Sequence, residues 1–254
     1  MAGPMAVQHG DRPRGDAPEV QPHPALVLPP AQLAGRIQHA LLGQGITERQ
    51  VRDHVQETLR YGFDAAIVPA SWVWAAKAEM RGTAGRVGSF IDYPNGNGTT
   101  AGRVAEAAAL VEAGVDELDT TVNVGYLLSS RYDEFAADIK AVVEAASPVG
   151  IKVMLELPLL DARQRQRCVQ AAIEAGVAFV GNASRGAVGI ADQSTISYLR
   201  GAVPDSVGVK AAGGIKTIEQ VRAVLVAGAD LVGSTAGVPI VTGGGPVRGS
   251  LYSY

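Results

Sequence analysis

Two lysines interrupt stretches of the chain that otherwise have the composition of buried strands. Lys152 lies among Ile, Val, Met and Leu residues, and Lys210 lies among Val, Gly and Ala residues. An ammonium group is costly to bury there unless a carboxylate pairs with it or its pKa falls. Asp119 and Glu156 occupy similar strand-like stretches and could supply that carboxylate. Lys210, Lys152 and Asp119 are therefore candidate catalytic residues, and the alternative is a structural ion pair between layers of the core.

Two glycine-rich turns have the composition of an anion-binding site. Gly213 and Gly214 follow the second lysine-containing stretch, and Gly233, Ser234 and Thr235 follow the next strand-like stretch. Backbone N–H groups in such turns, and at the start of a helix, attract phosphate oxygens. We predict a phosphate site from these five residues, although tight turns alone would also explain the glycines.

Further polar residues follow other strand-like stretches. The candidate substrate-binding residues on this ground are Asn123, Glu156, Asn182, Ser184 and Arg185. The guanidinium of Arg185 could hold a phosphate or carboxylate through two hydrogen bonds. An arginine in a loop can equally be solvated without any ligand.

The elements that would position these residues alternate between short apolar runs and longer helical patterns. This alternation is typical of βα units that build a parallel sheet. Seven strands are expected at 65–68, 85–91, 117–122, 150–156, 179–182, 206–211 and 231–234, and a less regular eighth near 36–42. Helices are expected at 47–61, 100–113, 132–146, 161–175 and 218–227, two of them with a Thr three residues before Gln as in a capping box.

The same alternation fits two fold classes, a single-domain (β/α)8 TIM barrel and an open doubly wound sheet. A chain of 254 residues suits one barrel, whose active site lies at the carboxyl ends of the strands. We expect the barrel to span residues 25–242, between a disordered tail at 1–24 and a flexible tail at 243–254. Tyr254 could donate a proton at the site only if that second tail folded back.

Composition and charge favour a small-molecule partner. The net charge is -3 and the basic residues are scattered, so no face is suited to nucleic acid. No run of about 18 apolar residues suggests a membrane anchor. The single cysteine, Cys168, is predicted to pack inside a helix, and its solitude fits a reducing cytoplasm. His39 has no second His or Cys at ligand spacing, so neither a metal site nor a cofactor is expected.

Six segments match, in order and spacing, those of a known family: residues 61–63, 113–119, 151–156, 175–180, 207–217 and 233–237. They resemble the deoxyribose-phosphate aldolases from about Leu33 to Gly237. The resemblance implies a TIM barrel and a class I aldolase acting on a small, phosphorylated aldehyde or sugar. In such an enzyme a strand lysine forms a Schiff base, a second lysine lowers its pKa and an aspartate relays protons. The resemblance places the second lysine at Lys210, the aspartate at Asp119 and a further site lysine at Lys152. It also implies a homodimer.

The resemblance breaks at Gly181, where the family's nucleophilic lysine should follow Phe179 and Val180. Other departures surround the same mouth, at Gly43, Gln38, Pro69 and Asp92–Tyr93. Three explanations stay open. Lys210 or Lys152 replaces the missing lysine, and the protein remains an aldolase-type lyase. The barrel instead runs a non-imine acid/base reaction, such as a cyclisation, isomerisation or elimination in a biosynthetic pathway. Or catalysis is lost and the chain only binds a ligand.

Overall fold

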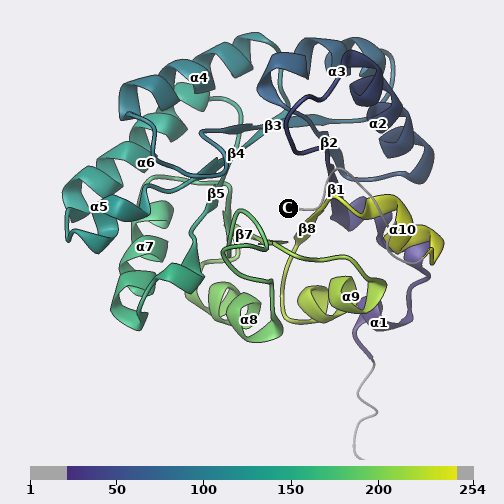
Figure 1. Ribbon diagram of the computed structural model, residues 1–254. Coiled ribbons are helices and arrows are strands. Elements are labelled where there is room, and N and C mark those ends of the chain that lie inside the picture. Colours follow the sequence, from purple (N-terminus) through teal and green to yellow (C-terminus); the bar gives the residue numbers. More distant parts are fainter. Residues whose placement is uncertain (1–21, 245–254) are drawn as a thin grey trace, which may run out of the picture.

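Eight parallel strands form a closed barrel in the computed structural model, which describes residues 22–244. Each strand pairs with the next along the chain, and the last pairs with the first, so the ring has no open edge (Figure 1). The strands are β1 (Ile37–Ala40), β2 (Ala65–Ile67), β3 (Val87–Ile91), β4 (Glu117–Thr121), β5 (Ile151–Met154), β6 (Phe179–Gly181), β7 (Gly208–Ala212) and β8 (Leu231–Ser234). The pairing of β8 with β1 confirms the TIM barrel and excludes the open sheet.

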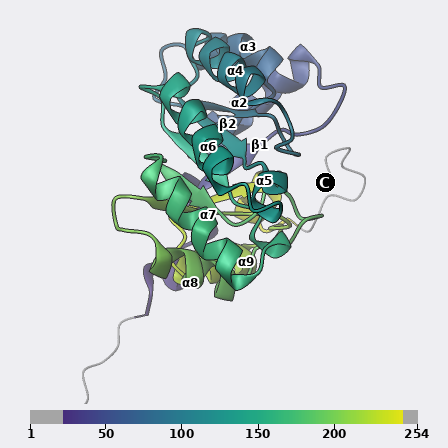
Figure 2. The same cartoon turned by 90° about the vertical axis from the view of Figure 1, so that its left-hand side faces the viewer.

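Helices cover the outside of this ring (Figure 1). They are α1 (Pro24–Val27), α2 (Glu48–Tyr61), α3 (Val73–Met80), α4 (Thr100–Glu112), α5 (Val124–Leu128), α6 (Tyr132–Ala146), α7 (Ala162–Glu174), α8 (Gln193–Ala202), α9 (Ile218–Val226) and α10 (Gly237–Thr242). From the side, α4, α6, α7 and α8 follow one another over the barrel (Figure 2). The tails predicted at 1–24 and 243–254, with Tyr254, lie almost entirely outside the described residues, so their disorder stays a prediction.

Local sequence signals explain where the helices begin and end. At the start of α2, the Thr47 side chain accepts a hydrogen bond from the Gln50 backbone, and the Gln50 side chain accepts one from the Thr47 backbone. This confirms the predicted capping box. At the other end, Gly62 has a φ of 70°, a left-handed conformation that glycine adopts without steric cost. The helix therefore stops and the chain turns into β2.

Alternation along the strands decides which side chains enter the barrel. On β4, Glu117 and Asp119 meet the interior lysines, whereas Leu118 between them is fully buried under the helices. The register pairs Asp119 with Lys152 on β5 and pairs position 181 on β6 with Lys210 on β7. The fold thus gathers the charged residues of three strands inside the barrel.

Helix α2 packs His54 against strand β1. The His54 Nε2 atom lies 3.0 Å from the His39 carbonyl oxygen, and the two imidazole rings stack 4.1 Å apart. Burial, and after it the neighbouring His39 ring, lowers the pKa of His54 well below its usual range, so the ring is neutral. A neutral ring whose Nε2 faces a carbonyl donates its proton there and leaves Nδ1 with a lone pair.

Cys168 packs inside α7, as predicted. Its side chain is fully buried, and burial raises the pKa of the thiol far above its ordinary value. The thiolate that would react or bind a metal is therefore not formed at neutral pH.

Candidate active site

The centre of the candidate site is an ion pair between two strands. The Lys210 ammonium on β7 donates to Asp119 Oδ2 on β4, and only 3% of the lysine side chain is exposed. Both residues line a pocket at the barrel mouth. The second carboxylate oxygen of Asp119, Oδ1, is buried without a hydrogen-bond partner. Asp119 therefore holds Lys210 with one oxygen, while its other oxygen lies 3.6 Å from the ammonium of Lys152.

Gly233 on β8 makes room for the lysine. A Cβ atom at this position would lie 3.1 Å from Lys210 Cε, which is tighter than ordinary packing. It would lie 3.7 Å from Nζ, an ordinary contact distance. The sequence analysis assigned Gly233 to a phosphate site. It does line the pocket, and its lack of a side chain also seats Lys210.

Lys152 lies deeper than Lys210. Its Nζ atom is 2.6 Å from Glu117 Oε2 and 3.6 Å from Asp119 Oδ1, its side chain is 2% exposed, and it does not line the pocket. The expectation that Glu156 could pair with one of the lysines is wrong, because Glu117 takes that role. Sequence reasoning missed Glu117, although its spacing of two residues from Asp119 on one strand was a usable signal.

A polar layer continues below this pair. Gln38 on β1 donates its amide hydrogens to Glu117 Oε1 at 2.7 Å and to Asp64 Oδ2 at 3.0 Å. Arg86 lies 3.7 Å from the other Glu117 oxygen. The buried Glu117 carboxylate is thus held by Lys152, Gln38 and Arg86 together, which compensates its loss of water.

Gly181 leaves no amine where the family resemblance expects one. It pairs in register with Met154 on one side and with Lys210 on the other. A Cβ atom at position 181 would lie 2.5 Å from both Sδ and Cε of Met154. The end of the Met154 side chain therefore occupies the space into which a residue at 181 would extend. Lys210 is the direct neighbour of that position.

The predicted phosphate-binding turns both reach the pocket. Gly213, Gly214, Gly233, Ser234 and Thr235 all line it, and Lys216, which the sequence analysis did not single out, lines it too. The Ser234 hydroxyl donates to the Ile215 carbonyl at 2.7 Å and accepts from the Ala236 N–H at 3.0 Å. It thereby ties the two turns together.

Ser184 and Arg185 lie on the β6 side of the mouth. Both line the pocket, and their contact with substrate stays a prediction. Tyr93 from the loop after β3 donates its hydroxyl to the Ser184 carbonyl at 3.1 Å. The Arg185 Nε atom is buried and has no hydrogen-bond partner. This unpaired N–H belongs to a residue that lines the pocket.

Three predicted substrate-binding residues do not line the pocket. The Asn123 side chain accepts from the Tyr126 N–H and caps α5, so its polarity serves the helix start. Asn182 bonds both the N–H and the carbonyl of Ala212 at 2.9 Å and links β6 to β7. The Glu156 carboxylate accepts from the Ser184 N–H at 2.6 Å beneath the loop. These residues follow strands, as expected, but their side chains bind backbone groups that shape the mouth of the barrel and do not line the pocket.

Burial perturbs Glu156. Its side chain is buried, Oε2 has no partner, and the backbone φ of 51° is unusual for a residue other than glycine. Desolvation raises the pKa of the carboxyl above its ordinary value, against the hydrogen bonds from Ser184 and the charge of Arg185. The Glu156 carboxyl, which lies below the pocket, therefore loses its proton less readily than an exposed glutamate.

Comparison with known proteins gives the same family by sequence and by structure. The chain is 36% identical over 209 residues to deoxyribose-phosphate aldolase 1 of Cutibacterium acnes, which covers 82% of this chain and 96% of that protein. The deoxyribose-phosphate aldolase of Streptococcus equi subsp. zooepidemicus is 34% identical over 207 residues, covering 82% and 94%. The chain belongs to the deoxyribose-phosphate aldolase family.

Solved structures of deoxyribose-phosphate aldolases have the same barrel. A putative member from Coccidioides immitis superposes with a TM-score of 0.80 at 31% identity, covering 84% of this chain and 85% of the other. The tetrameric deoxyribose phosphate aldolase of Aeropyrum pernix superposes with a TM-score of 0.77 at 29% sequence identity, and the match covers 84% of this chain and 91% of the other. No protein-family model matches the chain. Within residues 22–244, no helix has the length and apolar character needed to cross a bilayer.

Proposed function

We propose that the chain is an aldolase-type carbon–carbon lyase for a small phosphorylated aldehyde or sugar, with Lys210 as the amine that forms the Schiff base. The relatives named deoxyribose-phosphate aldolases support the substrate class. The observation that carries the proposal is the buried Lys210–Asp119 pair, which lines the pocket beside the glycine at position 181.

Lys210 fits this role better than Lys152. An attacking amine must reach a carbonyl carbon in the pocket, and of the two side chains only Lys210 lines it. Lys152 is held beneath, against Glu117, with the Phe179 ring 5.9 Å from its ammonium. We assign Lys152 a positioning role on Asp119.

The proposed reaction uses one amine and one carboxylate. Asp119 removes a proton from the Lys210 ammonium, and the amine adds to the substrate aldehyde to form a carbinolamine. Asp119 then returns that proton to the carbinolamine hydroxyl, which leaves as water, so that an iminium ion forms and the carboxylate is free again. Asp119 then accepts the proton of the β-hydroxyl, and the C–C bond breaks to release one aldehyde. The bonding electrons move into an enamine. Protonation of the enamine and hydrolysis of the imine release the second aldehyde and restore Lys210.

The two glycine-rich turns would hold the substrate phosphate. Gly213 and Gly214 line the pocket with φ values of 101° and 69°, a turn conformation that suits anion binding by backbone N–H groups, and Lys216 adds a positive charge. Inorganic phosphate should therefore protect the protein against heat, and it should protect Lys216→Ala less.

The second candidate is a non-imine acid/base reaction on the same barrel. The observation that favours it is the hydrogen bond from Lys210 to Asp119, because a lysine paired with a carboxylate is held as an ammonium ion and is not nucleophilic in that form. In that reaction, Asp119 and Lys210 would act as base and acid without covalent attachment.

Borohydride trapping distinguishes the two candidates. Wild-type protein and the variants Lys210→Arg and Lys140→Arg would be incubated with acetaldehyde or deoxyribose phosphate, reduced and mapped by peptide mass spectrometry. Lys140 lies on the exposed face of α6 and serves as the matched control. We expect an adduct on Lys210 in wild type and in the Lys140 variant, and none in the Lys210 variant. A folded wild-type protein that cleaves substrate without an adduct would support the second candidate.

We also propose a cytoplasmic enzyme that assembles as a homodimer. The lone buried thiol suits a reducing compartment, and the Aeropyrum pernix relative is itself an oligomer. Sedimentation velocity of the purified chain tests the assembly, and a monomer at micromolar concentration would contradict it.

A further inference from the structure

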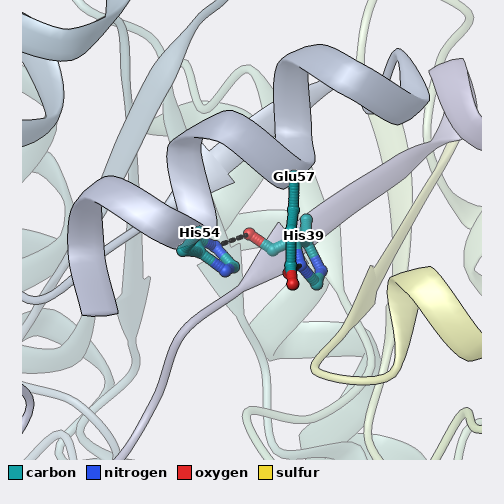
Figure 3. Close-up of side chains that lie close together, drawn as sticks. All are labelled: His39, His54 and Glu57. Carbon is teal, nitrogen blue, oxygen red and sulfur yellow. Dashed lines mark hydrogen bonds and ion pairs between the residues drawn. The ribbon is translucent and has the colours of Figure 1, made fainter. Parts of the chain in front are cut away.

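A second cluster of chemically active side chains lies on the outer wall of the barrel. His39 on β1 meets His54 and Glu57 on α2 (Figure 3). Its neighbour Gln38 lines the pocket, and successive side chains of a strand point to opposite faces. One ligand atom from each of the three side chains lies within 4.8 Å of the other two. The aldolase chemistry uses none of them.

The spacing of these atoms is close to that of metal ligands. Nitrogen and oxygen atoms bound to one tetrahedral Zn²⁺ at their usual bond lengths lie about 3.3 Å apart. His39 Nε2 and Glu57 Oε2 are already 3.1 Å apart. The His54 ring is stacked beside that of His39, so side-chain rotation must bring its nitrogen, now within 4.8 Å of the other two ligand atoms, closer to a shared ion.

Hydrogen bonding around the rings prepares the nitrogens for such an ion. His54 Nε2 faces the His39 carbonyl, which leaves its Nδ1 with a lone pair. A histidine that binds a metal commonly donates its other ring N–H to a backbone carbonyl in this way. His39 is 4% exposed, and within residues 22–244 its Nδ1 has no hydrogen-bond partner, whereas its Nε2 contacts Glu57.

The surroundings can accept a small cation. The three residues line a cleft together with Asp53 and Gln50, and nearly half of the Glu57 side chain is exposed. A hydrated ion can therefore enter from solvent. Asp53 adds a second negative charge at the rim, and a water molecule can complete the coordination.

We propose that His39, His54 and Glu57 form a Zn²⁺ site that fastens helix α2 to strand β1. Two imidazoles and a carboxylate are a donor set suited to zinc. Gln38 and Ala40, on either side of His39, both line the active-site pocket. The ion would therefore stiffen the wall of that pocket from outside. This site is independent of the Lys210 proposal.

Co²⁺ and Zn²⁺ titrations of tag-free, chelator-treated protein test the site. We expect one Co²⁺ per chain with a visible absorption band, displaced by Zn²⁺. Zinc at about 100 times its Kd should raise Tm by about 5–10 °C. His54→Gln keeps an N–H donor for the His39 carbonyl, and Glu57→Gln changes a half-exposed residue, so both variants should fold. Each should weaken binding more than about 100-fold, since even changes to outer-shell partners cost 10–100-fold.

His23→Asn is the matched control, because it removes a histidine outside the cluster and keeps a side chain able to cap α1. It should bind Co²⁺ like wild type. Absence of a stoichiometric Co²⁺ band in wild type, or binding unchanged in both cluster variants, would overturn the proposal.

Discussion

At the scale of single residues, the site depends on one missing side chain and on the residue that fills its place. Gly181 removes the amine expected from the family resemblance, and Met154 occupies the space beside it. Lys210 is the remaining pocket lysine inside the barrel, and Asp119 accompanies it. The proposed nucleophile therefore lies on β7, one strand away from position 181 on β6, and still lines the pocket at the barrel mouth.

Restoring the amine should create a steric conflict with Met154. In Gly181→Lys, the new Cβ would press on the Met154 thioether, and overpacking of this kind lowers the free energy of unfolding by about 1–3 kcal/mol. Adding Met154→Ala to Gly181→Lys should recover part of the loss, and the double-mutant cycle measured by urea unfolding should show coupling. Strict additivity of the two changes would mean that Met154 does not fill the place of the missing side chain.

Glu156 should make stability depend on pH. Its carboxyl binds a proton more tightly in the folded protein, because desolvation raises its pKa above the ordinary 4.5. As pH rises above about 4.5, the unfolded chain ionises first, so this group lowers the free energy of unfolding until the folded pKa is passed. Glu156→Gln keeps an acceptor for the Ser184 N–H and removes the ionisation. Its stability relative to wild type should therefore increase as pH rises from about 4.5 to the folded pKa in urea titrations. A decrease over that interval would contradict the assignment.

At the scale of elements, the strands place the reacting groups and the links between strands shape the pocket rim. Asn182 is the clearest link, since its amide bonds both backbone groups of Ala212 just before the Gly213–Gly214 turn. From its place after β6, Asn182 was predicted to bind substrate. The structure shows that it binds backbone, because its side chain points along the sheet toward β7.

Removal of this amide should weaken the junction of β6 and β7. In Asn182→Ala the N–H and carbonyl of Ala212 lose their partner, and each unsatisfied buried group costs about 1–3 kcal/mol. We expect urea unfolding to show a loss of at least about 2 kcal/mol. Asn95→Ala, at an exposed loop position, should change stability by less than about 0.5 kcal/mol. Equal losses of unfolding free energy in the two variants would contradict a structural role for Asn182.

At the scale of the whole molecule, closure of the barrel creates a polar layer that no single βα unit contains. Gln38 on β1, Glu117 on β4 and Lys152 on β5 meet below the pocket, and Asp119 joins them to Lys210 on β7. A buried carboxylate between such partners is stable only while all of them are present.

Lys152→Met tests this layer. The change leaves Glu117 buried with one cationic partner fewer and should lower the free energy of unfolding by about 3–5 kcal/mol. Lys77→Met removes a lysine of a similarly short ion pair, with Asp116, in which both side chains are 32% exposed. That control should lose less than about 1 kcal/mol. Denaturant titration measures both variants, and a loss as small as the control's would show that the buried pair contributes little.

The sequence by itself determined the alternation of strands and helices, the eight strands, and the helices α2, α4, α6, α7 and α9, because hydrophobic periodicity, capping residues and glycine turns act within a few residues of one another. The alternation alone left a barrel and an open sheet possible, and the family came from the resemblance of six segments. The sequence also identified Lys210, Asp119 and the glycine turns as pocket residues. Only the tertiary structure decided which lysine reaches the pocket, that Glu117 and not Glu156 pairs with Lys152, and that His54 lies beside His39. These outcomes depend on strand register and barrel closure, which bring together residues far apart in the chain and set the direction of each side chain.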